Sequence, residues 1–168
     1  MKEVFIVGPA RSGTTIFGET LSKVMDCEYW LEPKYLWKYK NFNLLSDVLT
    51  SSDLTPDIAR YIKKRIAQKL IRNNSSVYLD KTPSHVFRLP FIRAVFPECF
   101  LVFIERDPID TILSAEKKWN SSIPRSVFWR RVKNNDLTIV QLFKLLRSVF
   151  FRRNKLWGPM SKNVVEAA

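Results

Sequence analysis

The stretch that decides the fold is VFIVGPARSGTTIFGETL, residues 4–21. It reads as a short apolar strand, a glycine turn and the start of a helix, which is the order found in phosphate-binding P-loops. Gly8 and Gly13 have the spacing of the G-x-x-x-x-G-K-[ST] pattern, but Thr14 occupies the position of its lysine. That lysine reaches the β- and γ-phosphates in nucleoside triphosphatases, so its absence argues against ATP or GTP as a phosphoryl donor.

The glycine turn is a candidate anion site. Glycines allow backbone N–H groups to converge on an anion, and the N-terminus of the following helix adds the positive end of its dipole. An arginine within the turn can grip an oxyanion through two bonds at once. The alternative is a tight strand-to-helix turn in which glycine supplies positive φ and threonine caps the helix. The candidate binding residues are Arg11, Ser12, Gly13, Thr14 and Thr15.

Composition predicts one globular domain with an anionic partner. The chain has 168 residues and a net charge of +12, which favours a nucleotide, nucleic acid, acidic glycan or lipid headgroup. No apolar run approaches the roughly 20 residues of a membrane helix, and the N-terminus does not resemble a cleaved signal. Cys27 and Cys99 lack CxxC spacing and there is one histidine, which argues against a metal site and favours a reduced, cytoplasmic chain.

Strand and helix patterns alternate along the sequence. The predicted class is therefore α/β, a P-loop-type three-layer fold with a central parallel sheet flanked by helices. The strongest strand pattern is the apolar run in CFLVFIERDP, expected to be long and buried, whereas EYWLEPKYLWKYK is expected to be a loop leading into a short helix. We expect a single domain over residues 1–168, with residues 120–168 forming a basic helical portion.

A second anion site is predicted beyond the apolar run. Ligands of such sheets bind at the carboxyl ends of the strands, where Arg106 lies. With Asp107 as N-cap and Pro108 in the first helical position, Ser114 shares the helix face that looks back at this strand end. The alternative is a capped helix with an exposed arginine and an ordinary serine. Two anion sites without the triphosphate lysine indicate a nucleotide with phosphates on both the 5′ and the 3′ side of its ribose.

The motifs GPARSGTT, DKTPSH and ERDPIDTILS, in this order, resemble the sulfotransferase family over about the first 120 residues. The likeness is greatest to the protein-tyrosine and carbohydrate sulfotransferases. It implies 3′-phosphoadenosine 5′-phosphosulfate (PAPS) as donor, with no metal, and an acceptor hydroxyl on a glycan, a tyrosine or a small alcohol. The turn then holds the 5′-phosphosulfate, and Arg106 and Ser114 hold the 3′-phosphate.

The resemblance also implies catalytic roles. Glu32 loosely matches the position of the general base, with Asp80 as the reserve, and Lys81 matches a lysine that stabilises the transferring group. We expect Arg11 to share that task with Lys81 and the turn amides, because charge builds on the bridging oxygen during transfer. The alternatives are a solvated loop charge for Glu32 and a strand-flanking cation for Lys81.

Other functions remain open from the sequence. A P-loop kinase would use Asp80 as a metal ligand, although the turn lacks the lysine. The basic, aromatic residues 125–155 suggest a nucleic-acid or anionic-membrane binder, or a solvated helix face. Since the chain is short for the family, a nucleotide-binding protein without turnover is a further alternative. The sequence does not indicate the oligomeric state.

Overall fold

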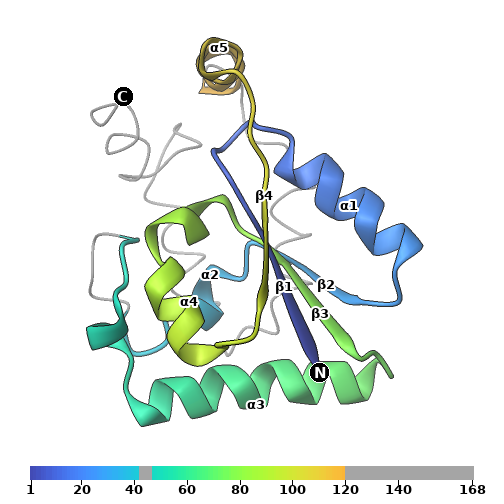
Figure 1. Cartoon of the computed structure of the whole chain (residues 1–168), viewed down its shortest axis with the longest axis vertical. Coiled ribbons are helices and arrows are strands. Elements are labelled where there is room, and N and C mark those ends of the chain that lie inside the picture. Colours follow the sequence, from blue (N-terminus) through green and yellow to red (C-terminus); the bar gives the residue numbers. More distant parts are fainter. Residues whose placement is uncertain (42–46, 120–168) are drawn as a thin grey trace, which may run out of the picture.

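A four-stranded, all-parallel sheet forms the centre of the structure (Figure 1). The structure is a computed structural model that describes residues 1–41 and 47–119. The predicted basic portion at 120–168 lies outside these residues. The strands, in the spatial order β2-β3-β1-β4, are β1 (Lys2–Val7), β2 (Glu28–Leu31), β3 (Val77–Lys81) and β4 (Phe100–Phe103).

Helices cover both faces of the sheet, which confirms the predicted α/β layering. Figure 1 shows α1 on one side of the strands and α2 and α4 on the other. The helices are α1 (Thr14–Val24), α2 (Lys34–Trp37), α3 (Pro56–Arg72), α4 (Leu89–Val95) and α5 (Pro108–Trp119), with short 3-10 turns at η1 (Ser51–Asp53) and η2 (Pro83–Phe87).

Alternation along the strands determines which side chains enter the main core. Phe5 and Tyr78 point to the face covered by α2, α3 and α4, where they are fully buried and their rings meet edge to face. Ile6 points to the opposite face, where Gly18 of α1 makes room for the Tyr29 ring. A Cβ on Gly18 would lie 2.9 Å from the Tyr29 hydroxyl oxygen, so this glycine permits α1 to pack closely against the sheet.

Helix α3 has a capped first turn and an apolar stripe along one face. Pro56 is the first helical residue, a position where the backbone N–H has no partner within the helix and is not needed. Thr55 Oγ1 accepts a hydrogen bond from the Ile58 amide and so caps the helix. Apolar side chains then recur every fourth residue and are buried against the sheet, namely Ile58, Ile62, Ile66 and Leu70.

The prediction of a loop at the start of EYWLEPKYLWKYK was wrong. Residues Glu28–Leu31 form β2, which pairs with β3 so that Leu31 lies opposite Lys81. The strand has only four residues and is followed closely by Pro33, so its local pattern is too short to distinguish from an aromatic loop. Pairing with β3 and burial of Trp30 stabilise it, and both are tertiary effects.

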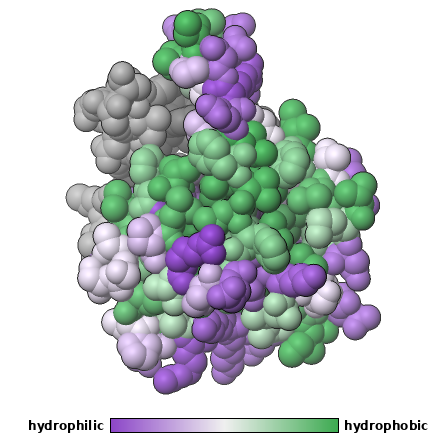
Figure 2. Space-filling view, viewed as in Figure 1, coloured by the Kyte–Doolittle hydropathy of each residue, from purple (hydrophilic) through white to green (hydrophobic). Residues whose placement is uncertain are grey.

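The prediction that the last apolar run is a long buried strand was also wrong. Within the described residues, β4 is a four-residue edge strand whose Phe100 and Phe103 side chains are 58% and 61% exposed. Figure 2 shows hydrophobic side chains gathered on the face of the molecule along which β4 runs in Figure 1. Apolar sequence signals strand formation here, but position at the edge of the sheet decides exposure.

Candidate functional site

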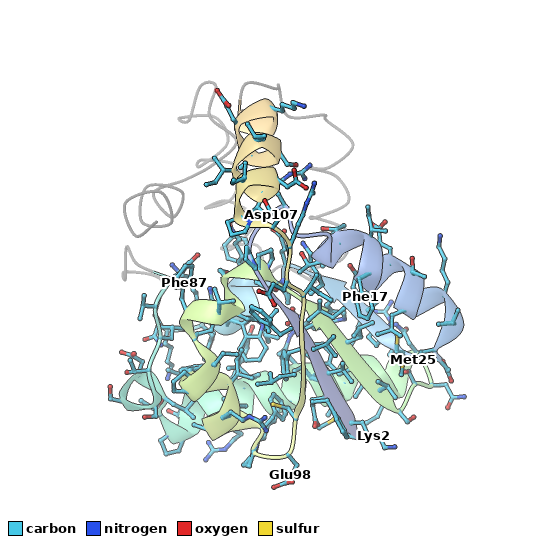
Figure 3. The ribbon with its side chains drawn as sticks, turned by 45° about the horizontal axis from the view of Figure 1, so that its top comes forward. Lys2, Phe17, Met25, Phe87, Glu98 and Asp107 are labelled. Carbon is cyan, nitrogen blue, oxygen red and sulfur yellow. The ribbon has the colours of Figure 1, made fainter. Side chains whose placement is uncertain are left out.

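The carboxyl ends of all four strands meet at one edge of the sheet, because every neighbouring pair is parallel. In Figure 3, Asp107 lies at this edge, while Lys2 and Glu98 mark the opposite end of the strands. The strand order sets the order of the predicted site residues along this edge: first Glu32 after β2, then Lys81 at the end of β3, the glycine turn after β1 and Arg106 beyond β4. Four segments distant in sequence therefore converge.

The glycine turn bends through two left-handed residues. Arg11 has φ 75° and Gly13 has φ 98°, and Gly13 directly precedes the first residue of α1. Successive turns of this kind aim backbone N–H groups into a concave, anion-accepting surface. The Ser12 hydroxyl donates to the Pro9 carbonyl at 2.8 Å, which fixes the shape of the turn. Thr14 and Ser12 are buried, Thr15 is partly buried, and Arg11 and Gly13 are exposed.

Arg106 and Ser114 both contact the glycine turn. Arg106 Nη1 donates to the Arg11 carbonyl oxygen at 3.2 Å, and Arg11 Nε donates to Ser114 Oγ at 3.2 Å. Ser114 thus lies on the face of α5 that was predicted to look towards the strand ends. Two guanidinium groups and a hydroxyl converge at one place, where the excess of hydrogen-bond donors suits an anion.

The start of α5 follows the sequence prediction. Asp107 Oδ1 accepts a hydrogen bond from the Asp110 amide at 3.0 Å, so Asp107 is the N-cap, and Pro108 is the first helical residue. Sequence analysis did not single out Asp110, whose Oδ2 lies 3.6 Å from Arg106 Nη2. The four-residue spacing of the two in ERDPID is the signal that could have identified this pair.

Glu32 and Lys81 form an ion pair at the ends of β2 and β3. Lys81 Nζ lies 3.0 Å from Glu32 Oε1, with side-chain exposures of 3% and 18%. The Glu32 amide also donates to the Lys81 carbonyl oxygen at 3.0 Å, which extends the pairing of the two strands. Glu32 has φ 54°, an uncommon conformation for a side chain of this kind and one that accumulates at functional sites.

The surroundings of Asp80 argue against both roles considered for it, the reserve base in sulfuryl transfer and the metal ligand of a kinase. Its carboxylate is fully buried and accepts hydrogen bonds from Trp37 Nε1, Tyr78 OH and Thr82 Oγ1 at 2.7 to 2.8 Å. Burial alone would raise the pKa of Asp80, but the nearby His85 and the hydrogen bonds from Thr82 and Tyr78 hold that pKa below its ordinary value. Asp80 is a satisfied core carboxylate, not an accessible base.

His85 is part of the same core. Its ring packs edge to face on Phe5 and Trp37, and Nε2 lies 3.2 Å from Asp80 Oδ1 without the alignment of a hydrogen bond. Burial holds the pKa of His85 below its ordinary value, although the neighbouring Asp80 charge works in the opposite direction. His85 is therefore a packed core residue.

The described residues contain neither a metal-binding cluster nor a helix that could span a membrane. Across residues 1–41 and 47–119, no group of three or more His, Cys, Asp or Glu side chains is arranged to hold a metal ion. No helix in this part of the chain combines the length and the apolarity that crossing a bilayer requires.

Comparison with known proteins identifies a family for this chain. Residues 45–143, more than half of the chain, match the sulfotransferase family. No curated protein matches the sequence significantly. The matched segment contains β3, with Lys81 at its end, as well as Arg106 and the capped helix that carries Ser114. The family match covers more than half of the chain, and the all-parallel sheet flanked by helices is consistent with it, so the chain belongs to the sulfotransferase family.

Proposed function

We propose that this protein transfers a sulfuryl group from PAPS to an acceptor hydroxyl. The observation that carries the proposal is the convergence of Arg106 and Ser114 on Arg11, through hydrogen bonds of 3.2 Å each. Ser114 and Arg106 lie 103 and 95 positions after Arg11 in the sequence, so these hydrogen bonds bring a second set of donors next to the glycine turn. A ligand with an anionic group on each side of its ribose would engage both.

The glycine turn would hold the 5′ side of the nucleotide. The first amides of α1 point out of the helix without intrahelical partners, and the helix dipole adds positive potential there. Among the described residues, no atom lies within 4 Å of a Cβ added at Gly13, apart from the chain neighbours of this glycine, so this part of the structure leaves space there for a ligand. Arg106 and Ser114 would hold the 3′-phosphate, displacing the mutual contacts that they now make through Arg11.

Glu32 and Lys81 would carry the chemistry of transfer. The acceptor hydroxyl gives its proton to the Glu32 carboxylate while its oxygen forms the new bond to sulfur. The bond between sulfur and the bridging oxygen breaks, and its electron pair stays on the 5′-phosphate of the departing 3′,5′-bisphosphate. Lys81 and Arg11 stabilise the charge on that oxygen from fixed positions, which is the condition under which such donors accelerate a reaction.

The proposal extends to the rest of the chain and to the acceptor. Residues 1–168 would form one domain, to which the basic residues 120–168 belong. The acceptor would be a glycan, a tyrosine side chain or a small alcohol, presented near Glu32 at the β2 end of the edge.

The nucleotide assignment is tested by ligand-dependent thermal unfolding of the full chain. We expect 3′,5′-bisphosphoadenosine (PAP) to raise the Tm more than 5′-AMP or ATP with Mg²⁺. Arg106→Ala should abolish the preference for PAP over 5′-AMP, because lost charge-assisted hydrogen bonds cost about 1.5–3 kcal/mol, or roughly 10- to 100-fold in Kd. Arg60→Ala is the matched control, since Arg60 pairs with Asp57 on the exposed face of α3.

Three outcomes separate the alternatives. Equal shifts by PAP and 5′-AMP in the parent and in Arg106→Ala would show that the 3′-phosphate assignment is wrong. A larger shift with ATP and Mg²⁺ would favour a kinase. A PAP response without release of PAP from PAPS, in the presence of phenolic, alcohol and glycan acceptors, would identify a nucleotide-binding protein without turnover.

A further inference from the structure

A buried carboxylate connects the two segments that carry the ion pair of Glu32 and Lys81. Asp80 immediately precedes Lys81 on β3, yet its side chain points to the core face of the sheet. Trp37 Nε1 donates to Asp80 Oδ2 at 2.8 Å, across 43 positions of sequence. Trp37 ends α2, the short helix that begins two residues after Glu32. One hydrogen bond therefore joins the residue before Lys81 to the helix after Glu32.

This bond is held rigidly. Trp37 is fully buried, and its ring packs edge to face against Phe5 and His85. Asp80 also accepts from Tyr78 and Thr82, so its carboxylate cannot rotate without losing further hydrogen bonds. The donor and the acceptor are thus both fixed by their own neighbours.

The backbone at Glu32 requires such support. A left-handed φ of 54° costs energy for a residue with a side chain, and it persists only where the surroundings impose it. The Glu32 amide donates to the Lys81 carbonyl at 3.0 Å, and the Lys34 amide donates to the Glu32 carbonyl at 2.7 Å. These bonds fix the turn locally, while the Trp37 contact fixes where α2 lies relative to β3.

We propose that Trp37 and Asp80 are positioning residues, which hold the Glu32 carboxylate over Lys81 by docking α2 onto β3. The inference rests on the proposed function for the catalytic roles of Glu32 and Lys81, but its geometric part stands independently. Neither positioning residue would touch a substrate. Their effect on transfer would pass through the distance and direction of the Glu32–Lys81 pair, since small displacements of a catalytic group lower rates severely.

A matched control lies on the same carboxylate. Tyr78 OH donates to Asp80 Oδ2 at 2.8 Å and is as fully buried as Trp37. Tyr78 belongs to β3 itself, however, so its bond with Asp80 joins β3 only to β3. Trp37→Phe and Tyr78→Phe each remove one donor from the same oxygen, but only Trp37→Phe removes the link to α2.

The test compares hydrogen exchange and turnover of the two variants in the full chain. We expect Trp37→Phe to speed exchange of the Glu32 amide about tenfold more than Tyr78→Phe does, after correction for global stability with the slowest core amides. We also expect kcat for sulfuryl transfer to fall at least about tenfold in Trp37→Phe alone, with an unchanged PAP-induced shift in Tm. Because Trp37→Phe also removes buried ring volume that Tyr78→Phe keeps, the same difference should appear with β-(3-benzothienyl)alanine at position 37, which lacks only the N–H group.

Equal exchange at the Glu32 amide in the two variants would overturn the inference. Equal loss of kcat would do so as well. If the parent protein binds PAP but transfers nothing, the proposed function fails, and the exchange comparison still decides the positioning role. If Trp37→Phe does not fold, β-(3-benzothienyl)alanine at position 37 keeps the ring shape and removes only the N–H group, and the same comparison applies.

Discussion

Replacing Gly8 with alanine should destabilise the fold strongly, because the glycine turn touches the backbone of the neighbouring strand segment at this point. Gly8 has φ 150°, a value that residues with side chains rarely adopt. An added Cβ would lie 3.3 Å from the Ile104 carbonyl carbon and closer still to its oxygen. Ile104 cannot move away freely, since its amide donates to the Val7 carbonyl at 2.9 Å.

The magnitude follows from these three contributions. Backbone strain costs about 1–3 kcal/mol, crowding of a packed site about 1–3 kcal/mol, and loss of the Ile104–Val7 hydrogen bond about 1 kcal/mol. We therefore expect Gly8→Ala to lower the free energy of unfolding by roughly 3–7 kcal/mol, a large part of the stability of a small domain. Urea denaturation followed by circular dichroism measures the loss.

Gly13→Ala is the matched control. Gly13 also has a left-handed φ, 98°, but an added Cβ would meet no atom of residues 1–41 and 47–119 within 4 Å beyond its own chain neighbours. Only backbone strain applies, so the expected loss is about 1–3 kcal/mol. Losses of equal size in the two variants would refute the steric argument and would show that the close approach of the turn to Ile104 does not limit stability.

The remaining predictions concern the buried histidine and the α5 cap. Because burial lowers the pKa of His85 in the folded protein, the unfolded chain binds more protons near pH 6, so the unfolding free energy should fall as pH drops from about 7 towards 5. His85→Gln should flatten that slope in urea titrations, and an unchanged slope would contradict it. Asp107→Ala should lower the free energy of unfolding by about 1 kcal/mol and reduce the PAP-induced shift in Tm, because it loosens the helix that carries Ser114. Asp107→Asn should retain both the stability and the shift. Equal stability and equal shifts in the two variants would contradict a capping role for Asp107.

Local patterns in the sequence were sufficient for the elements that carry strong periodicity or punctuation. The apolar run before Gly8 and the Asp107–Pro108 start of α5 both appear where they were predicted. The parallel arrangement then brought Arg106 to the same edge as the glycine turn. In each case the signal lies within a few residues of the feature it predicts.

The failures concern features decided by distant residues. Strand β2 forms because β3 lies beside it, and the edge position of β4 depends on the order of the whole sheet. Asp80 resembles a catalytic carboxylate at a strand end, but Trp37, 43 positions away, occupies one of its oxygens. The contact of Glu32 with Lys81 spans 49 positions, so the sequence offered two candidates but not their pairing.

The strand order gives the functional edge a direction. The groups proposed to bind the nucleotide lie after β1 and beyond β4, whereas Glu32 lies after β2, with β3 and Lys81 between them. Under the proposed function, the acceptor would be selected at one end of this edge of the sheet and PAPS would be held at the other. Evolution or an engineer could then diversify the β2–α2 end for new acceptors while the machinery for the shared reagent is inherited intact.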